Sequence, residues 1–119
     1  MKILITASHN AMDAPVDSRF GRAPWFAVVD LDTDSIVFVE NSQNLNAMQG
    51  AGIQSGQNAV QLGVSAVITG HVGPKAFTVL QAAGITIHQA PVSTVTEAVD
   101  QFRNGMLPIL DTSDKPGHW

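Results

Sequence analysis

The chain has 119 residues, of which 45% are hydrophobic, and six Lys and Arg against ten Asp and Glu give a formal net charge of −4. This length supports one packed domain, and the acidic balance argues against a nucleic-acid binder, because such proteins neutralise phosphates with basic clusters. The absence of cysteine excludes disulfides, thiolate nucleophiles and cysteine-ligated zinc or iron–sulfur clusters.

The first half of the chain predicts three strands and a loop. The β-branched run at residues 2–7 predicts a buried first strand that is too short for a signal-peptide core or a membrane span, so we expect a soluble cytoplasmic protein. Residues 26–31 and 36–40 predict an antiparallel hairpin, because the intervening Asp-Thr-Asp is typical of a tight turn. Residues 41–52 are rich in Asn, Gln and Gly and predict a long loop.

Helices and strands alternate in the second half. Apolar periodicity, a Pro at one helix start, a Thr-x-x-Glu capping box and glycines at helix ends predict these elements. In chain order they are a helix over 53–62, a strand over 64–69, a helix over 74–83, a strand over 85–88 and a helix over 95–102. Strand–helix–strand units favour parallel neighbours, so we expect a mixed five-stranded sheet covered by helices. The sequence therefore predicts one domain over residues 1–107 and a C-terminal tail over residues 108–119.

Four segments carry a family resemblance: VDSRFGRAPWFAVVD, GAG before the second half, VITGHVGPKAFTVLQAAGI and TVTEAVDQFRNGML. In order and spacing they resemble the dinitrogenase iron-molybdenum cofactor biosynthesis family over residues 1–107. The resemblance implies a ribonuclease H-like three-layer α/β fold with strand order 3-2-1-4-5 and an antiparallel second strand. It also implies a small accessory or carrier protein. The lack of cysteine is compatible with a subgroup that holds a mixed molybdenum–copper sulfide cluster non-covalently.

With this strand order, the expected ligand site lies beyond the carboxyl ends of the first and fourth strands, where connections leave to opposite sides. The loops there are residues 8–22 and 70–74. Arginines in the first loop, and glycine N–H groups, a helix start and a lysine in the second, suit an anionic metal-sulfide cluster. The candidate cofactor-binding residues are Arg19, Phe20, Gly21, Arg22, Gly70, His71, Val72, Gly73 and Lys75, with Gly50 and Gly52 as a further N–H cradle.

The RFGR segment also has a structural interpretation. In that case one arginine pairs with Asp13, Asp17 or Asp30, and Phe20 fills the core. Candidate metal contacts lie in loops and carry imidazole or thioether groups, which suit copper. They are His9, Met12 and Met48, whereas Met106 is assigned to packing.

Catalytic patterns are missing from the sequence. It has no GxSxG, Walker A or GxGxxG motif, and the central strand KILITA lacks the carboxylates that a magnesium-dependent nuclease needs. We therefore expect no enzymatic activity, and the family resemblance implies a carrier or store of a molybdenum-containing metal-sulfide cofactor. A Mo–Cu–S cluster is favoured over iron-molybdenum cofactor or its precursor. The rival function is a metal-free interaction module that acts with a partner ATPase. Expected partners are the cofactor and an acceptor protein, without nucleic acid or membrane, for a monomer or weak dimer.

Overall fold

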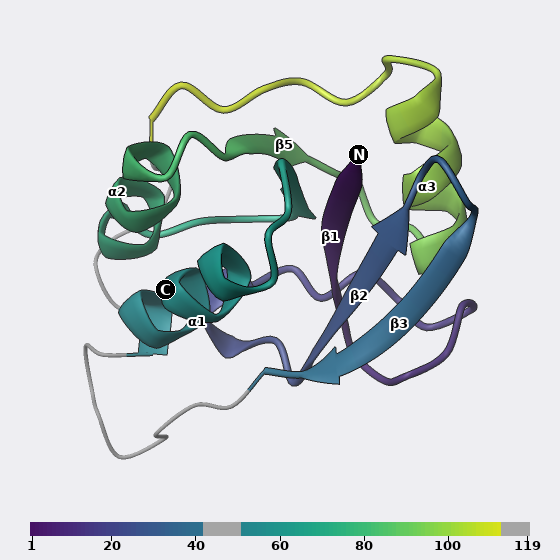
Figure 1. The fold of residues 1–119 in the computed structure, drawn as a ribbon, viewed down its shortest axis with the longest axis horizontal. Helices are drawn as coiled ribbons and strands as arrows, with labels where there is room; N and C mark the ends of the chain where they lie inside the picture. The colour runs from purple at the N-terminus through teal and green to yellow at the C-terminus, as the bar shows by residue number, and fades with distance from the viewer. Residues whose placement is uncertain (42–50, 113–119) are drawn as a thin grey trace.

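The computed structural model describes residues 1–41 and 51–112, and its centre is a five-stranded sheet of order β3-β2-β1-β4-β5 (Figure 1). The elements are β1 (Lys2–Ala7), the 3-10 helix η1 (Phe20–Arg22), β2 (Trp25–Asp30), β3 (Ser35–Glu40), α1 (Ala51–Gln61), β4 (Ala66–Thr69), α2 (Pro74–Ala82), β5 (Thr86–Gln89) and α3 (Val95–Arg103). Strand β2 is antiparallel to β1 and β3, whereas β4 is parallel to β1 and β5. The predicted strand order and the antiparallel second strand are confirmed.

Helices cover both faces of the sheet and produce three layers (Figure 1). Because successive side chains of a strand point to opposite faces, β1 contributes Leu4 to the core under α1 and α2, and Ile3 and Ile5 to the core under α3. The central strand is therefore apolar on both faces. The helices have 11, 9 and 9 residues, and within the described part of the chain none is long and apolar enough to cross a membrane.

Local signals explain where several elements begin and end. The Asp-Thr-Asp turn between β2 and β3 places Asp34 at φ 57°, a left-handed conformation that Asp tolerates better than most residues. At the start of α3, the Glu97 N–H donates to Thr94 Oγ1 (3.2 Å) and the Thr94 N–H donates to Glu97 Oε1 (2.9 Å). This reciprocal capping box confirms the one predicted from sequence.

The chain remains packed beyond Leu107. The Gln89 N–H donates to the carbonyl of Pro108 (2.9 Å), and the Leu110 N–H donates to the carbonyl of Ile87 (2.8 Å). Residues 108–110, which the sequence analysis assigns to a tail, thus lie along the outer edge of β5. This arrangement fixes the segment after α3 against the end of β5 that carries the candidate site.

Candidate functional site

The two loops predicted to form the site contact each other directly. The Phe20 N–H donates to the carbonyl oxygen of His71 (3.1 Å), and Arg19 forms an isolated parallel bridge with His71. A Cβ atom added to Gly70 would lie 2.8 Å from both the Cα and the carbonyl oxygen of Ser18. Glycine at position 70 therefore allows the two backbones to approach, which is a structural reason for that residue.

Buried hydroxyl groups fix the first loop to the central strands. Thr6 on β1 and Thr69 at the end of β4 are fully buried, and their hydroxyl oxygens lie 2.9 Å apart. The Thr6 hydroxyl donates to the carbonyl of Asp17 (2.7 Å), and the Asp17 carboxylate accepts the backbone N–H of Arg19 (2.9 Å). Because buried polar groups need partners, these bonds hold the loop in one position just before the arginines.

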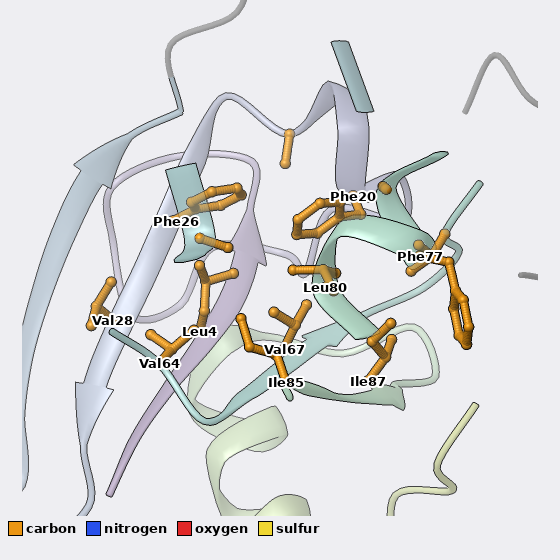
Figure 2. Close-up of a cluster of buried hydrophobic side chains, with 14 residues drawn as sticks. Leu4, Phe20, Phe26, Val28, Val64, Val67, Phe77, Leu80, Ile85 and Ile87 are labelled. Carbon is orange, nitrogen blue, oxygen red and sulfur yellow. The ribbon is translucent and has the colours of Figure 1, made fainter. Parts of the chain in front are cut away.

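The RFGR segment divides into buried and accessible residues. Phe20 is fully buried in the core under α1 and α2, and its ring stacks on Phe26 with centroids 5.7 Å apart (Figure 2). Gly21 is also buried, and its carbonyl accepts the Ser55 hydroxyl (3.3 Å). Arg19 is exposed and Arg22 is half-buried. The side chain of Phe20 is thus a core residue, as in the structural interpretation of this segment, and it does not form an apolar wall for a ligand.

Arg19 and Arg22 form no ion pair with another residue within residues 1–41 and 51–112. Asp17, one of the three proposed aspartate partners, accepts the backbone N–H of Arg19 instead of its guanidinium. Fixed backbone and unpaired guanidinium charge together make this loop suited to binding an anion.

The second loop leads directly into α2. Val72 is fully buried, and Gly73 is the N-cap of α2, with φ −79°, ψ 168° and no side-chain capping bond. Lys75 is half-buried and lines a groove of about 370 Å³ together with Ile53, near the starts of α1 and α2. Gly52, the residue before Ile53, lies in the first turn of α1. Gly50 lies outside the described residues.

A separate cavity of about 560 Å³ opens at the carboxyl ends of β1, β4 and β5. Ser18, Gly70 and His71 from the two predicted loops line it, as do Gln89, Val92 and Met106. This volume is in the range of small-ligand sites, which are mostly apolar with a few polar groups. Gly70 and His71 therefore lie at this cavity and Lys75 lies at the groove between α1 and α2, whereas Arg19 and Arg22 line neither of these two hollows.

The part of the cavity wall after β5 was not predicted from sequence. The Gln89 side-chain amide donates to the carbonyl of Gly70 (3.0 Å), which joins this segment to the GHVG loop. A signal was available, because the carboxyl ends of parallel neighbours meet at one edge and β5 was predicted as the last parallel strand. The sequence of this segment, QAPVS, has no charge or motif that would single it out.

The three candidate metal contacts are not gathered at this cavity. His9 is exposed and does not line it, and Met48 lies outside the described residues. Met12 lines a different groove of about 200 Å³ beside α3, where its carbonyl accepts the Thr96 N–H (3.1 Å). Within residues 1–41 and 51–112, no three or more His, Asp or Glu side chains are grouped so that they could hold a metal ion.

Comparisons with known proteins identify the family and the fold. The sequence profile described as "Dinitrogenase iron-molybdenum cofactor" matches residues 1–105. The apo form of the orange protein from Desulfovibrio gigas is 41% identical, with 96% of each chain covered and a TM-score of 0.91. The NMR structure of a Thermotoga protein described as belonging to the DUF35 family is 29% identical, with 96% of this chain and 97% of that chain covered and a TM-score of 0.80.

A curated sequence relative extends the same relationship. An uncharacterized protein from Methanocaldococcus jannaschii is 30% identical over 109 residues, which cover 90% of this chain and 89% of that protein. Both the profile match and this relative span nearly all of the folded domain. The chain therefore belongs to the dinitrogenase iron-molybdenum cofactor family.

Proposed function

We propose that this protein carries or stores a molybdenum-containing metal-sulfide cofactor and does not itself catalyse a reaction. Membership of the cofactor family and similarity to the orange protein over 96% of the chain support a cofactor-binding role. Similarity to the orange protein makes a molybdenum–copper sulfide cluster our favoured cargo over iron-molybdenum cofactor or its precursor, and the absence of cysteine is compatible with it.

The observation that carries the proposal is the hydrogen bond from the Phe20 N–H to the His71 carbonyl (3.1 Å). It joins the arginine-bearing loop to the loop that opens α2, beside a 560 Å³ cavity. A thiometallate cluster is an anion, and Arg19 and Arg22 provide cationic guanidinium donors. The site therefore offers charge and backbone geometry for a cluster without offering a thiolate ligand.

The cavity adds a second property that a labile cluster requires. Val92 and Met106 contribute apolar surface, and the polar groups along the wall are few. Val92 and Met106 are largely open to solvent, so a cluster seated there would cover exposed apolar surface, which favours binding. Non-covalent retention would depend on this burial together with the charge of the arginine loop.

The test is to load metal-free protein with tetrathiomolybdate and copper, remove unbound metal by desalting, and record the visible spectrum with the molybdenum and copper content. Retained charge-transfer bands with a fixed Mo to Cu ratio are expected. Molybdenum retained without copper would show that the protein binds thiomolybdate but not the mixed cluster. Loading with iron-molybdenum cofactor or its precursor, followed by the same desalting step, tests that alternative cargo. A colourless, metal-free protein would contradict the carrier function and favour the metal-free module that acts with a partner ATPase.

A further inference from the structure

Met106 is an unusual feature of the cavity rim. It is a large apolar side chain with 67% of its surface exposed, and it follows α3 at the edge of the 560 Å³ cavity. The neighbouring Leu107 is buried in the core under α3. The chain thus places one residue of this pair in the core and leaves the other exposed in the lining of the cavity.

The backbone at Met106 is held firmly by the end of α3. The Gly105 N–H donates to the Phe102 carbonyl (3.0 Å), and the Met106 N–H donates to the Gln101 carbonyl (3.0 Å). With Gly105 at φ 68°, these two bonds form a Schellman motif. In such motifs the residue at position 106 often packs back on the helix, but here it remains exposed.

The same wall is attached to the predicted ligand loops. The Pro108 carbonyl accepts the Gln89 N–H (2.9 Å), and the Gln89 side chain donates to the Gly70 carbonyl (3.0 Å). Gly70 is followed by His71, which lines the same cavity as Met106. The Met106 thioether and the His71 imidazole are soft or borderline metal donors. The segments that carry them are connected by the two hydrogen bonds of Gln89.

Other thioethers of the described chain lie elsewhere. Met12 lines the groove beside α3, and Met1 is at the β2–β3 turn, where its ammonium group pairs with Asp32. Because the sequence has no thiolate, soft sulfur contact to a metal must come from methionine. Met106 is the described methionine that shares a cavity with the predicted cofactor loops.

We propose that Met106 and His71 form a copper(I)-binding pair on the wall of this cavity. Thioether sulfur selects copper(I) among the common cellular metals, and imidazole is also a copper ligand. The role of this pair in cluster carriage rests on the proposed function. In that role, Met106 and His71 would bind the copper of a Mo–Cu–S cluster, and Arg19 would contact the anionic part of the same cluster. Copper selectivity then comes from Met106 and anion retention from the arginines.

The test uses copper(I) alone and tetrathiomolybdate alone, each with wild-type protein, Met106→Leu and Met12→Leu, under anaerobic conditions. Copper(I) affinity is measured by competition with bicinchoninate. Loss of a residue that only hydrogen-bonds to a metal ligand lowers metal affinity about 10-fold or more. Loss of the Met106 sulfur, which is a direct ligand in this proposal, should therefore weaken copper(I) binding by at least about tenfold. Met12→Leu should bind copper(I) like wild type, and His71→Asn should show a loss similar to Met106→Leu.

The two probes separate this inference from the carrier function. Tetrathiomolybdate retention should be unchanged in Met106→Leu, because leucine keeps the apolar surface at position 106 and the arginine loop is intact. Equal copper(I) affinity in wild type and Met106→Leu, or an equal loss in Met12→Leu, overturns the copper pair whatever happens to molybdenum. If copper(I) binding depends on Met106 but no protein retains molybdenum, the copper pair stands and the cluster-carrier function fails.

Discussion

Gly70 and Ser18 are in backbone contact so close that a methyl group on Gly70 would lie 2.8 Å from the Ser18 Cα and carbonyl oxygen. The contact places the loop after β4 directly against the segment that leads into η1. Since the atoms in the way belong to backbone, a side-chain rotation cannot relieve the clash. The geometry of the candidate site thus depends on a residue that has no side chain.

Gly70→Ala should consequently destabilise the fold and disturb the site. The extra carbon forces the two loops apart, and overpacking of this kind costs about 1–3 kcal/mol in free energy of unfolding. Urea denaturation measures the loss, and the desalting assay measures cluster retention.

Gly63→Ala is the matched control for that change. Gly63 has φ 72° with nothing near an added Cβ, so the substitution costs about 1 kcal/mol of backbone strain and leaves the site loops unchanged. A Gly70→Ala variant as stable and as competent in cluster retention as wild type would show that the loops can separate without consequence.

The charges of the site make a second prediction. Arg19→Ala combined with Lys75→Ala should lower cluster retention, because the variant removes the exposed cation of the RFGR loop and the cation at the start of α2 while the fold stays intact. Metal content after desalting measures the effect, and circular dichroism verifies folding. If the proposed carrier function holds but metal content is unchanged in this variant, the cargo lies elsewhere on the protein.

A control with the same change in net charge is available at the opposite end of β1. Lys2 begins β1 and is exposed, and Arg103 ends α3, where it pairs with Asp34 of the β2–β3 turn. The double variant Lys2→Ala and Arg103→Ala should retain the cluster as wild type does. Comparable losses in the two double variants would indicate an effect of net charge rather than of a site.

The fold was predictable from the sequence because its signals are local. The β-branched run at residues 2–7 gives the observed bounds of β1, and Thr94 with Glu97 marks the start of α3. The predicted and observed bounds differ by two residues at β4, where glycine and serine flank the apolar run. The strand begins at Ala66, whereas the sequence predicted a start at Val64. Short apolar runs do not by themselves specify which end residue pairs with a neighbour.

The candidate site was only partly predictable. The contact between the RFGR and GHVG loops followed from the strand order, but the direction of the Phe20 side chain did not, because a loop phenylalanine suits either a core or a ligand wall. Met106 was assigned to packing, since an apolar residue after a helix usually packs back on it. Its exposure at the cavity depends on Leu107 filling the core instead, which only the three-dimensional structure shows.

The burial of Phe20 makes a third prediction. Phe20→Ala should lower the free energy of unfolding by about 3–5 kcal/mol, because it removes a fully buried ring that stacks on Phe26 and leaves a cavity under α1 and α2 (Figure 2). Chemical denaturation measures this change. The half-buried Phe38 on β3 offers a comparison, and Phe38→Ala should cost less. An equal loss of free energy of unfolding in Phe20→Ala and Phe38→Ala would contradict the burial of the Phe20 ring in the core.

The imidazole of His88 makes the last prediction, which concerns pH. His88 lies on β5 with its ring edge-on to Phe102, centroids 4.9 Å apart, and its Nε2 is 3.0 Å from the Thr86 hydroxyl. Burial lowers the pKa of His88 below its ordinary value of 6.5, although a backbone hydrogen bond at Leu107 opposes the shift.

Since the unfolded chain binds this proton more readily than the folded chain, stability is greatest above pH 6.5 and falls as the pH decreases through that value. The free energy of unfolding of wild type should therefore drop between pH 7.5 and pH 5.5 by more than that of His88→Gln, which has no imidazole to protonate. Urea denaturation at the two pH values measures both differences. A wild-type loss no larger than that of His88→Gln would show that the β5 imidazole is protonated equally well in the folded and unfolded chain.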